Sequence, residues 1–295
     1  MDVAAITQLL QSSYDGLSPQ LRQAARYILA HPEEVALTSM RRVAAHAAVK
    51  PSTMVRLARA IGFEGFEDLR EPYRQWLRGG EGAFEARARS LRARGADGTE
   101  TLLQEIDAAD AANLAGASGP AVHMAVLDAA DALVAARRVF VLGLRSCFSL
   151  AHYFHYTCSM VGIETRLIDG HGGTFLDALR GIGDGDVLLA FSFRPYSRET
   201  VKAVETAVED GAEVIAVTDA AVSPLARPAR HVMVVETASP NFFQSLVGPL
   251  AVTQQLLGAV VCRVGEDGLA ALKDHERHLK QFDAYWQEPK RRRRP

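Results

Sequence analysis

The chain has 295 residues, a formal net charge of −2 and a hydrophobic share of 48%. This length favours two domains, because one domain typically holds about 100 to 200 residues. No stretch approaches the roughly 20 uninterrupted apolar residues of a membrane-spanning helix, and the N-terminal sequence MDVAAITQLLQSSYDG lacks the basic and apolar regions of an export signal. We therefore expect a cytoplasmic protein without a membrane partner.

The three cysteines, Cys147, Cys158 and Cys262, are odd in number and have no C-x-x-C spacing. This pattern argues against both a disulfide framework and a zinc site. We expect three reduced thiols, no metal and no cofactor.

Positive charge is concentrated at the two ends of the chain. Residues 1–78 hold ten Lys and Arg against eight Asp and Glu, the tail 290–294 holds five positive charges, and the remainder is acidic. This separation predicts a nucleic-acid contact at one end of the molecule. The tail itself fits either a solvated extension or a non-specific phosphate contact.

Residues 1–78 show helical periodicity and no alternating run typical of a strand, which predicts an all-α domain. Ser18-Pro19 is a helix-start signal, His31-Pro32 marks a break, and Thr38 or Ser39 caps the next helix. Two glycine-rich stretches, 79–82 and 94–98, flank an arginine-rich piece that fits a linker. The predicted organisation is a helical domain at 1–78 that contacts nucleic acid, a linker at 79–98, a second domain at 99–286 and a basic tail at 287–295.

The second domain begins with an alanine-rich helical region, 99–136, which is interrupted at 116–120. Short apolar runs separated by helical stretches then predict five strands. Runs that are apolar on both faces indicate a parallel sheet flanked by helices, so the second domain is of the α/β class. Ligands in such sheets bind at the carboxyl ends of the strands, here the loops after Leu142, Phe191 and Val217. The five runs are 139–142, 165–168, 186–191, 214–217 and 231–235.

Segment 38–63 is typical of a helix-turn-helix. Small residues let two short helices approach closely, and Pro51-Ser52 starts a second helix that runs to about Ala60. In this motif, exposed side chains near the start of the second helix read base edges in the major groove. Arg56 is the first choice for base readout, and an ordinary helical hairpin with a solvated basic face is the alternative. The candidate DNA-binding residues, all expected on the exposed side, are Lys50, Ser52, Thr53, Arg56 and Arg59.

The sequence SMRRVAAHAAVKPSTMVRLARAIGFEGFEDLR, residues 39–70, resembles the N-terminal domain of the RpiR family of bacterial regulators. Residues 49–69 follow that family's pattern, with Lys50 where serine is common. The resemblance extends over nearly all of residues 1–262. It implies a SIS (sugar isomerase) fold for the second domain, and double-stranded operator DNA and a phosphorylated sugar or sugar acid as partners.

Both loops that hold the ligand in SIS domains depart from the usual pattern in this chain. The first, usually G-x-G-x-S-x-x-x-A, is Gly143 to Ala151 with Arg145 for the second glycine, and the second, usually S-x-S-G-x-T, has Arg194 and Pro195 for serine and glycine. Two added guanidinium groups favour an anion, either a phosphate or a carboxylate. Alternatively, either arginine pairs with Asp169, Glu199 or Asp219 and only holds its loop, and His171 is simply exposed. The candidate ligand-binding residues are Arg145, Ser146, Cys147, His171, Ser192, Arg194 and Ser197.

Two other functional classes compete with a regulator. A SIS-fold sugar-phosphate isomerase needs a general base, and 239–244, where isomerases tend to place glutamate, offers no carboxylate, although His171 and Glu199 remain available. A module that binds a partner other than DNA is the other alternative. We expect no catalytic residues. We also expect a homodimer or homotetramer, because one helix-turn-helix makes few DNA contacts. An apolar helix at 242–261 and the segment 269–286 are candidate interfaces, and a role in the core is the alternative for the first.

Overall fold

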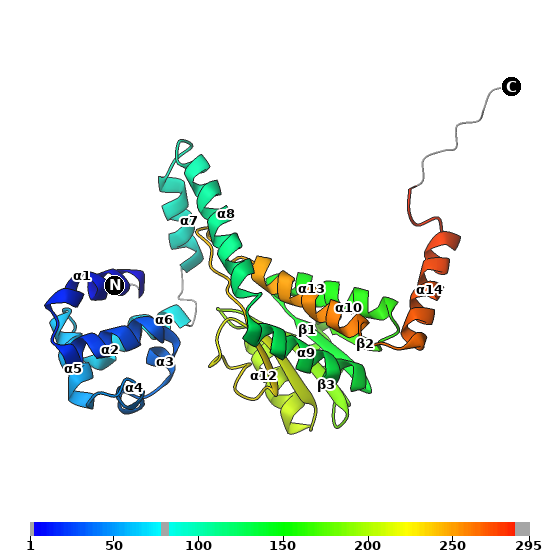
Figure 1. Ribbon diagram of the computed structural model, residues 1–295, viewed down its shortest axis with the longest axis horizontal. Helices are drawn as coiled ribbons and strands as arrows, with labels where there is room; N and C mark the ends of the chain where they lie inside the picture. The colour runs from blue at the N-terminus through cyan, green and yellow to red at the C-terminus, as the bar shows by residue number, and fades with distance from the viewer. Residues whose placement is uncertain (1–2, 78–82, 287–295) are drawn as a thin grey trace. The chain divides into compact units, whose positions relative to one another are not determined.

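A computed structural model describes residues 3–77 and 83–286 of the chain, arranged as two compact units (Figure 1). The helical unit comprises the described residues up to Ile106 together with 193–196 and 239–244, and the sheet unit comprises the rest. The glycines at 79–82 and the tail at 287–295 lie outside the described residues.

The helical unit contains seven short helical segments within residues 3–77. Two of the predicted helix starts are confirmed, since one helix begins at Pro19 and the next at Pro32. Ser39 caps the following helix, and its hydroxyl oxygen accepts a hydrogen bond from the backbone N–H of Arg42 at 3.4 Å. The segments are α1 (Val3–Ser13), η1 (Tyr14–Gly16), α2 (Pro19–Ala30), α3 (Pro32–Leu37), α4 (Met40–His46), α5 (Pro51–Ala60) and α6 (Phe66–Leu77).

One hydrophobic core joins these helices. Val43 from α4 and Met54 and Leu57 from α5 are completely buried, together with Ile28 from α2 and Leu69 from α6. The sequence left open whether Met54 or Val55 turns inward, and the structure buries Met54 while Val55 is half-buried. The α4–α5 pair is therefore fixed in a helical bundle, as a helix-turn-helix requires.

The turn between α4 and α5 depends on Ala48, whose φ of 51° lies in the left-handed region that favours glycine. Gln23 of α2 stabilises this turn, because its amide nitrogen donates to the carbonyl oxygen of Ala47 at 3.0 Å. Ala48→Gly is expected to raise the free energy of unfolding of the helical unit by up to about 1 kcal/mol, because glycine adopts this φ without a steric penalty. Thermal unfolding of the full chain measures this, and a lower melting temperature for the variant would contradict it.

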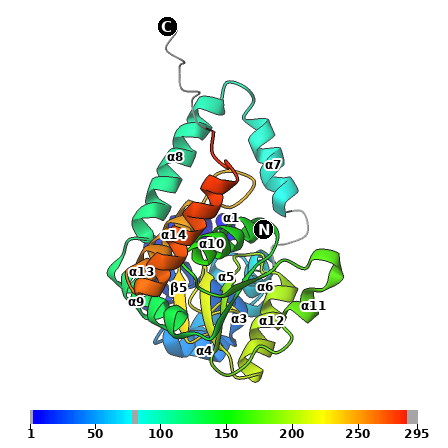
Figure 2. The same cartoon turned by 90° about the vertical axis from the view of Figure 1, so that its right-hand side faces the viewer.

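Part of the predicted linker is helical. Residues 83–93 form α7 (Ala83–Ala93), which is followed by α8 (Thr99–Gly116). Figure 2 shows the two helices as a hairpin, in which Arg94 and Glu105 form an ion pair at 2.6 Å. The helix forms because alanine, arginine and glutamate are good helix formers, and Glu85 and Arg89 pair one turn apart at 2.7 Å. The domain boundaries given above remain a prediction.

The sheet unit contains a parallel five-stranded sheet with the order β2-β1-β3-β4-β5, which confirms the fold class expected from the apolar runs. Strand β3 is buried along its whole length, as a central strand covered on both faces must be. The strands are β1 (Arg138–Gly143), β2 (Thr165–Ile168), β3 (Asp186–Phe191), β4 (Glu213–Thr218) and β5 (His231–Val234).

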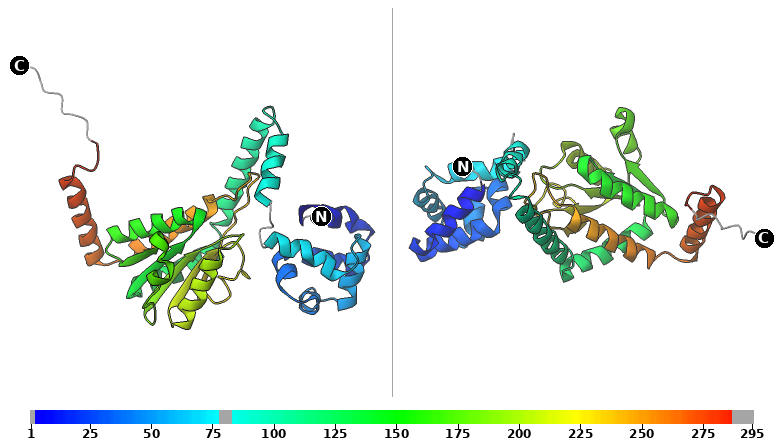
Figure 3. Two further views of the ribbon diagram at one scale, coloured as in Figure 1. Left: turned by 180° about the vertical axis from the view of Figure 1, so that it is seen from behind. Right: turned by 90° about the horizontal axis from the view of Figure 1, so that it is seen from above.

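Helices cover both faces of this sheet. α10 (Phe148–Met160) packs on β1 and β2, while α13 (Val247–Val261) lies between α10 and α9 (Pro120–Ala135) in the same layer (Figure 3). α12 (Arg198–Glu209) packs on β3 and β4 from the opposite face, because the strand order reverses at β1 and right-handed crossovers then fall on opposite sides. The remaining segments are η2 (Arg145–Cys147), η3 (His171–Gly173), α11 (Phe175–Ala178) and α14 (Glu266–Gln281).

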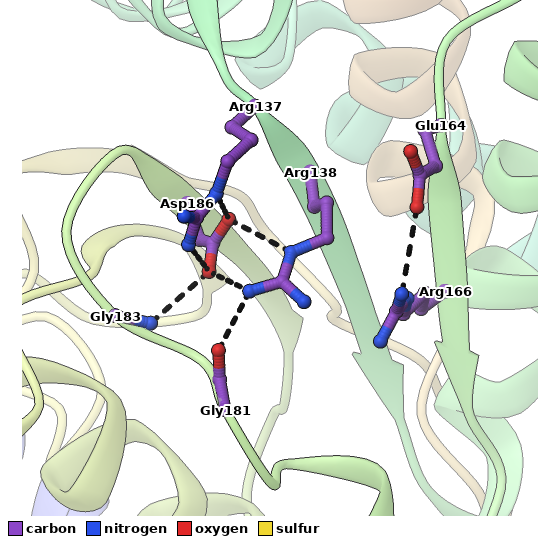
Figure 4. A network of polar contacts seen from close by, with 7 residues as sticks. All are labelled: Arg137, Arg138, Glu164, Arg166, Gly181, Gly183 and Asp186. Carbon is purple, nitrogen blue, oxygen red and sulfur yellow. Dashed lines mark hydrogen bonds and ion pairs between the residues drawn. The ribbon is translucent and has the colours of Figure 1, made fainter.

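An ion cluster closes the amino edge of the sheet, where the strands begin (Figure 4). The carboxylate of Asp186, completely buried at the start of β3, accepts hydrogen bonds from Arg137 and Arg138 at 2.6 to 3.1 Å and from the backbone N–H of Gly183 at 3.1 Å. Burial alone would raise the pKa of Asp186, but the hydrogen bonds and charges of the two arginines together hold that pKa well below its usual range.

The apolar helix predicted for 242–261 begins only at Val247. Side chains of Ser239, Asn241 and Ser245 accept hydrogen bonds from nearby backbone N–H groups, which competes with helix formation before that point. Among residues 3–77 and 83–286, no single helix has the length and apolarity needed to cross a membrane. α13 and α14 together reach both, but the chain bends by 113° between them.

Candidate functional site

The predicted DNA-reading face lies on the first half of α5. Lys50, Ser52 and Arg56 are exposed, and among the described residues the side chains of Lys50 and Arg56 have no hydrogen-bond or ion-pair partner. Arg59 is exposed as well, but its Nε donates to the backbone oxygen of Glu64 at 3.2 Å. Three side chains near the helix start are therefore available to solvent, and Arg59 is tied to the segment that follows.

The exposure predicted for Thr53 is wrong. Its residue surface is only 3% exposed, and it shares the inward face of α5 with Met54 and Leu57. The physical reason is helical rotation: residue 53 stands about 100° from residue 52 and one turn before Leu57, so it points toward the core. Thr53 therefore supports the helix rather than presenting a hydroxyl to DNA.

The candidate ligand site lies at the carboxyl edge of the sheet. Gly143 at the end of β1 pairs with Phe191 at the end of β3, and Phe191 pairs with Val217 of β4. The loops after these strands therefore start side by side, at the point where the strand order reverses. Thr218, which the sequence did not single out, joins two of them, because its hydroxyl donates to the backbone oxygen of Ser192 at 2.9 Å.

The loop after β1 needs a glycine at 143 and holds Arg145 in an unusual conformation. A Cβ on Gly143 would lie 2.4 Å from the carbonyl oxygen of Cys147, so only glycine lets η2 approach the strand. Arg145 has a φ of 56°, in the left-handed region. This explains why glycine is usual at that position, and an L side chain there costs about 1 to 2 kcal/mol. The Arg145 side chain is exposed.

The loop after β3 presents a different surface. Ser192 is buried, with its backbone N–H donating to the Val217 oxygen at 3.2 Å, whereas Arg194 is half-buried. Pro195 has no N–H, so this loop lacks one of the donors that a backbone anion cradle would use. Ser197 caps α12, and its hydroxyl oxygen accepts from the backbone N–H of Thr200 at 3.5 Å.

His171 lies after β2 and pairs with Asp169. Its Nδ1 is 2.8 Å from a carboxylate oxygen of Asp169, and its backbone N–H donates to the other oxygen at 2.9 Å. The backbone hydrogen bond from His171 is the main cause of the lowered pKa of Asp169. Asp169 therefore pairs with His171 rather than with an arginine. The imidazole is largely exposed.

The predicted ligand residues differ in how accessible they are. Three of them are at least partly exposed and lie in the loops after the neighbouring strands β1 and β3: Arg145, Ser146 and Ser197. Cys147, the last residue of η2, is only 5% exposed. Its burial, like that of Ser192, weighs against a side-chain contact with a ligand, and the assignment of both stays a prediction.

Two domain models match the chain. The helix-turn-helix domain of the rpiR family matches residues 4–75, and the SIS domain matches residues 132–259. These two ranges coincide with the helical bundle and with the sheet and its covering helices.

Known proteins are similar over most of the chain. The HTH-type transcriptional regulator HexR of Pseudomonas aeruginosa is 28% identical over 231 residues, which cover 75% of each chain. The sugar isomerase domain of an RpiR transcription factor from Sphaerobacter thermophilus is 31% identical with a TM-score of 0.55, covering 60% of this chain and 98% of that one.

A third similar structure is the Vibrio vulnificus NanR protein complexed with ManNAc-6P. It has a TM-score of 0.57, 18% identity and coverage of 95% of this chain and 99% of that one, so the two proteins share a fold. Together with the two matched domains, these similarities show that the chain belongs to the RpiR family of helix-turn-helix transcriptional regulators with a SIS domain.

Proposed function

We propose that this protein is a cytoplasmic homo-oligomer that binds a specific operator and whose affinity for that operator is set by a small anionic metabolite. The exposed start of α5 supports the DNA-binding part of this proposal. Lys50, Ser52 and Arg56 lie there, and in a helix-turn-helix this part of the second helix is the one that enters the major groove. The side chains of Lys50 and Arg56 form no hydrogen bond within the described chain, so both charges are available to DNA.

Arg145 supports the ligand-binding part of the proposal. A non-glycine residue in a left-handed conformation is usually retained for a function that offsets its strain, and here it brings a guanidinium to the edge where ligands of such sheets bind. Ser146, Ser197 and His171 would add donors, and Arg194 a second positive charge. The ligand classes that fit are sugar phosphates, sugar acids and small carboxylates. The similar NanR protein supports the first class, because its structure is a complex with ManNAc-6P.

The proposed role is binding rather than catalysis. The stretch 239–244 after β5 offers no carboxylate to act as a general base, and Glu199 lies exposed in the first turn of α12. Coupling between ligand and operator must be reciprocal, so operator DNA changes ligand affinity by the same factor as ligand changes DNA affinity. Equal ligand affinities with and without operator would contradict the regulatory proposal.

Arg56→Ala is expected to cost about 1 to 3 kcal/mol at the base pair that Arg56 reads, and to relax the sequence preference there. The operator is first selected from a random duplex pool with the full wild-type chain, and both proteins are then titrated against single-base variants of it. Arg230→Ala is the control, because it removes the same charge from an exposed position just before β5 in the sheet unit. A variant that keeps the wild-type preference at every position would exclude Arg56 as a base reader.

A further inference from the structure

Charge in the helical unit is divided between two regions. Residues 35–63, which contain α4 and α5, hold no Asp or Glu and five Lys and Arg. The helix that follows, α6, carries Glu67, Asp68 and Glu71. A positive potential therefore lies over the α4–α5 pair and is not neutralised by acids in the same segment.

Several arginines outside the α4–α5 pair form hydrogen bonds or ion pairs with other residues of the chain. Arg70 forms an ion pair with Glu67 and donates to the Thr38 carbonyl oxygen at 2.8 Å. Arg74 lies 3.7 and 3.8 Å from carboxylate oxygens of Glu67 and Glu71, and Arg22 donates to the Leu17 carbonyl oxygen at 2.9 Å. These three side chains hold the fold and neutralise local charge.

Arg41 and Arg42 of α4 behave differently. Both are exposed, and within residues 3–77 and 83–286 neither has a hydrogen-bond, ion-pair or ring partner for its side chain. An arginine side chain that contacts nothing in its own chain adds little to stability, yet two adjacent ones raise local repulsion. Such a pair is suited to an anion from outside the molecule.

The geometry of α4 directs these guanidinium groups to one surface. Val43 and Ala44 turn into the core, while Arg41, Arg42 and Ala45 lie on the exposed side. Because the Ala45 side chain is only a methyl group, it does not keep another molecule away from this side of α4. The Ser39 hydroxyl already accepts from the backbone N–H of Arg42, so the side chains rather than this N–H are available for binding.

We propose that Arg41 and Arg42 bind two phosphates of the operator backbone, and so fix the position of α5 without reading sequence. The inference rests on the proposed function, because it assumes that α5 enters the major groove, where the preceding helix of the motif crosses the DNA backbone. A guanidinium forms paired, charge-assisted hydrogen bonds with phosphate oxygens. Phosphate contacts orient the protein and carry no base information.

The test measures how the affinity of the full chain for DNA depends on salt. Each neutralised phosphate contributes about −0.9 to the slope of log K against log salt concentration. Arg41→Gln with Arg42→Gln is therefore expected to make the slope less steep by about two for each protomer bound. The change should be the same on random-sequence duplex and on the selected operator. A second double variant, Arg41→Lys with Arg42→Lys, keeps both charges and should keep most of the slope.

Arg230→Gln, just before β5 in the sheet unit, serves as the charge-matched control and should leave the slope unchanged. A wild-type slope for the Gln double variant would overturn the phosphate assignment alone. A changed sequence preference would overturn it too, since it would make these residues base readers. Absence of DNA binding by the wild-type chain would instead overturn the proposed function, and this inference with it.

Discussion

Replacing Asp186 with alanine is expected to lower the free energy of unfolding of the sheet unit by about 3 to 5 kcal/mol. Removing one partner from a buried ion cluster leaves the others without compensation, and that loss is larger than the net contribution of the intact pair. Arg138 would lose its carboxylate partner at the start of β1, and the N–H of Gly183 would lose its acceptor. Chemical denaturation of the full chain, followed by circular dichroism, measures the change.

The acid dependence of stability provides a second signature of the same residue. The pKa of Asp186 is lower in the folded chain than in the unfolded one, so its contribution is fully present above the ordinary aspartate pKa of about 4. This contribution to stability is lost as the pH falls from about 4 through the pKa that Asp186 has in the folded chain. Asp186→Asn should flatten this part of the stability profile. An unchanged profile would mean that the cluster contributes nothing to folding.

Replacing Arg145 with glycine is expected to separate stability from ligand binding. Glycine relieves the left-handed φ of 56°, so the free energy of unfolding should rise by up to about 1 kcal/mol. Ligand affinity should fall about tenfold or more, because a charge-assisted hydrogen bond contributes about 1.5 to 3 kcal/mol. Thermal-shift screening with sugar phosphates, sugar acids and small carboxylates measures both quantities on one sample.

Arg145→Ala is the matched comparison, because it removes the guanidinium and keeps the backbone strain. It should lose ligand affinity without gaining stability. If Arg145→Gly keeps wild-type ligand shifts, then Arg145 is not part of the binding site. A less stable glycine variant would show instead that the arginine side chain holds its own loop.

The sheet could be predicted closely because its signal is local. Runs such as 186–191 are apolar on both faces, which only a central parallel strand explains well, and the observed β3 has the same limits. The start of α13 was missed for an equally local reason. Short polar side chains at Ser239 and Ser245 bind the backbone there, and an apolar average over the segment does not register them.

The candidate sites were less predictable because side-chain direction depends on the whole fold. Thr53 and Ser52 are neighbours, yet one is buried and the other exposed, and the phase of α5 is set by packing against other helices. The left-handed conformations of Ala48 and Arg145 carry no signal in the residues themselves. Only the comparison with the usual glycine pattern indicated that position 145 is unusual.

The cluster around Asp186 and the loops that follow Gly143 and Phe191 stand at opposite edges of one sheet. The length of the strands separates the loops from the ion cluster. A sequence change in the loops therefore does not reach the residues that hold the strand starts together. A substitution at Arg145 is therefore expected to leave the hydrogen bonds of Asp186 intact. On the proposed function, ligand specificity can then change through the loops while the strand starts keep the same scaffold.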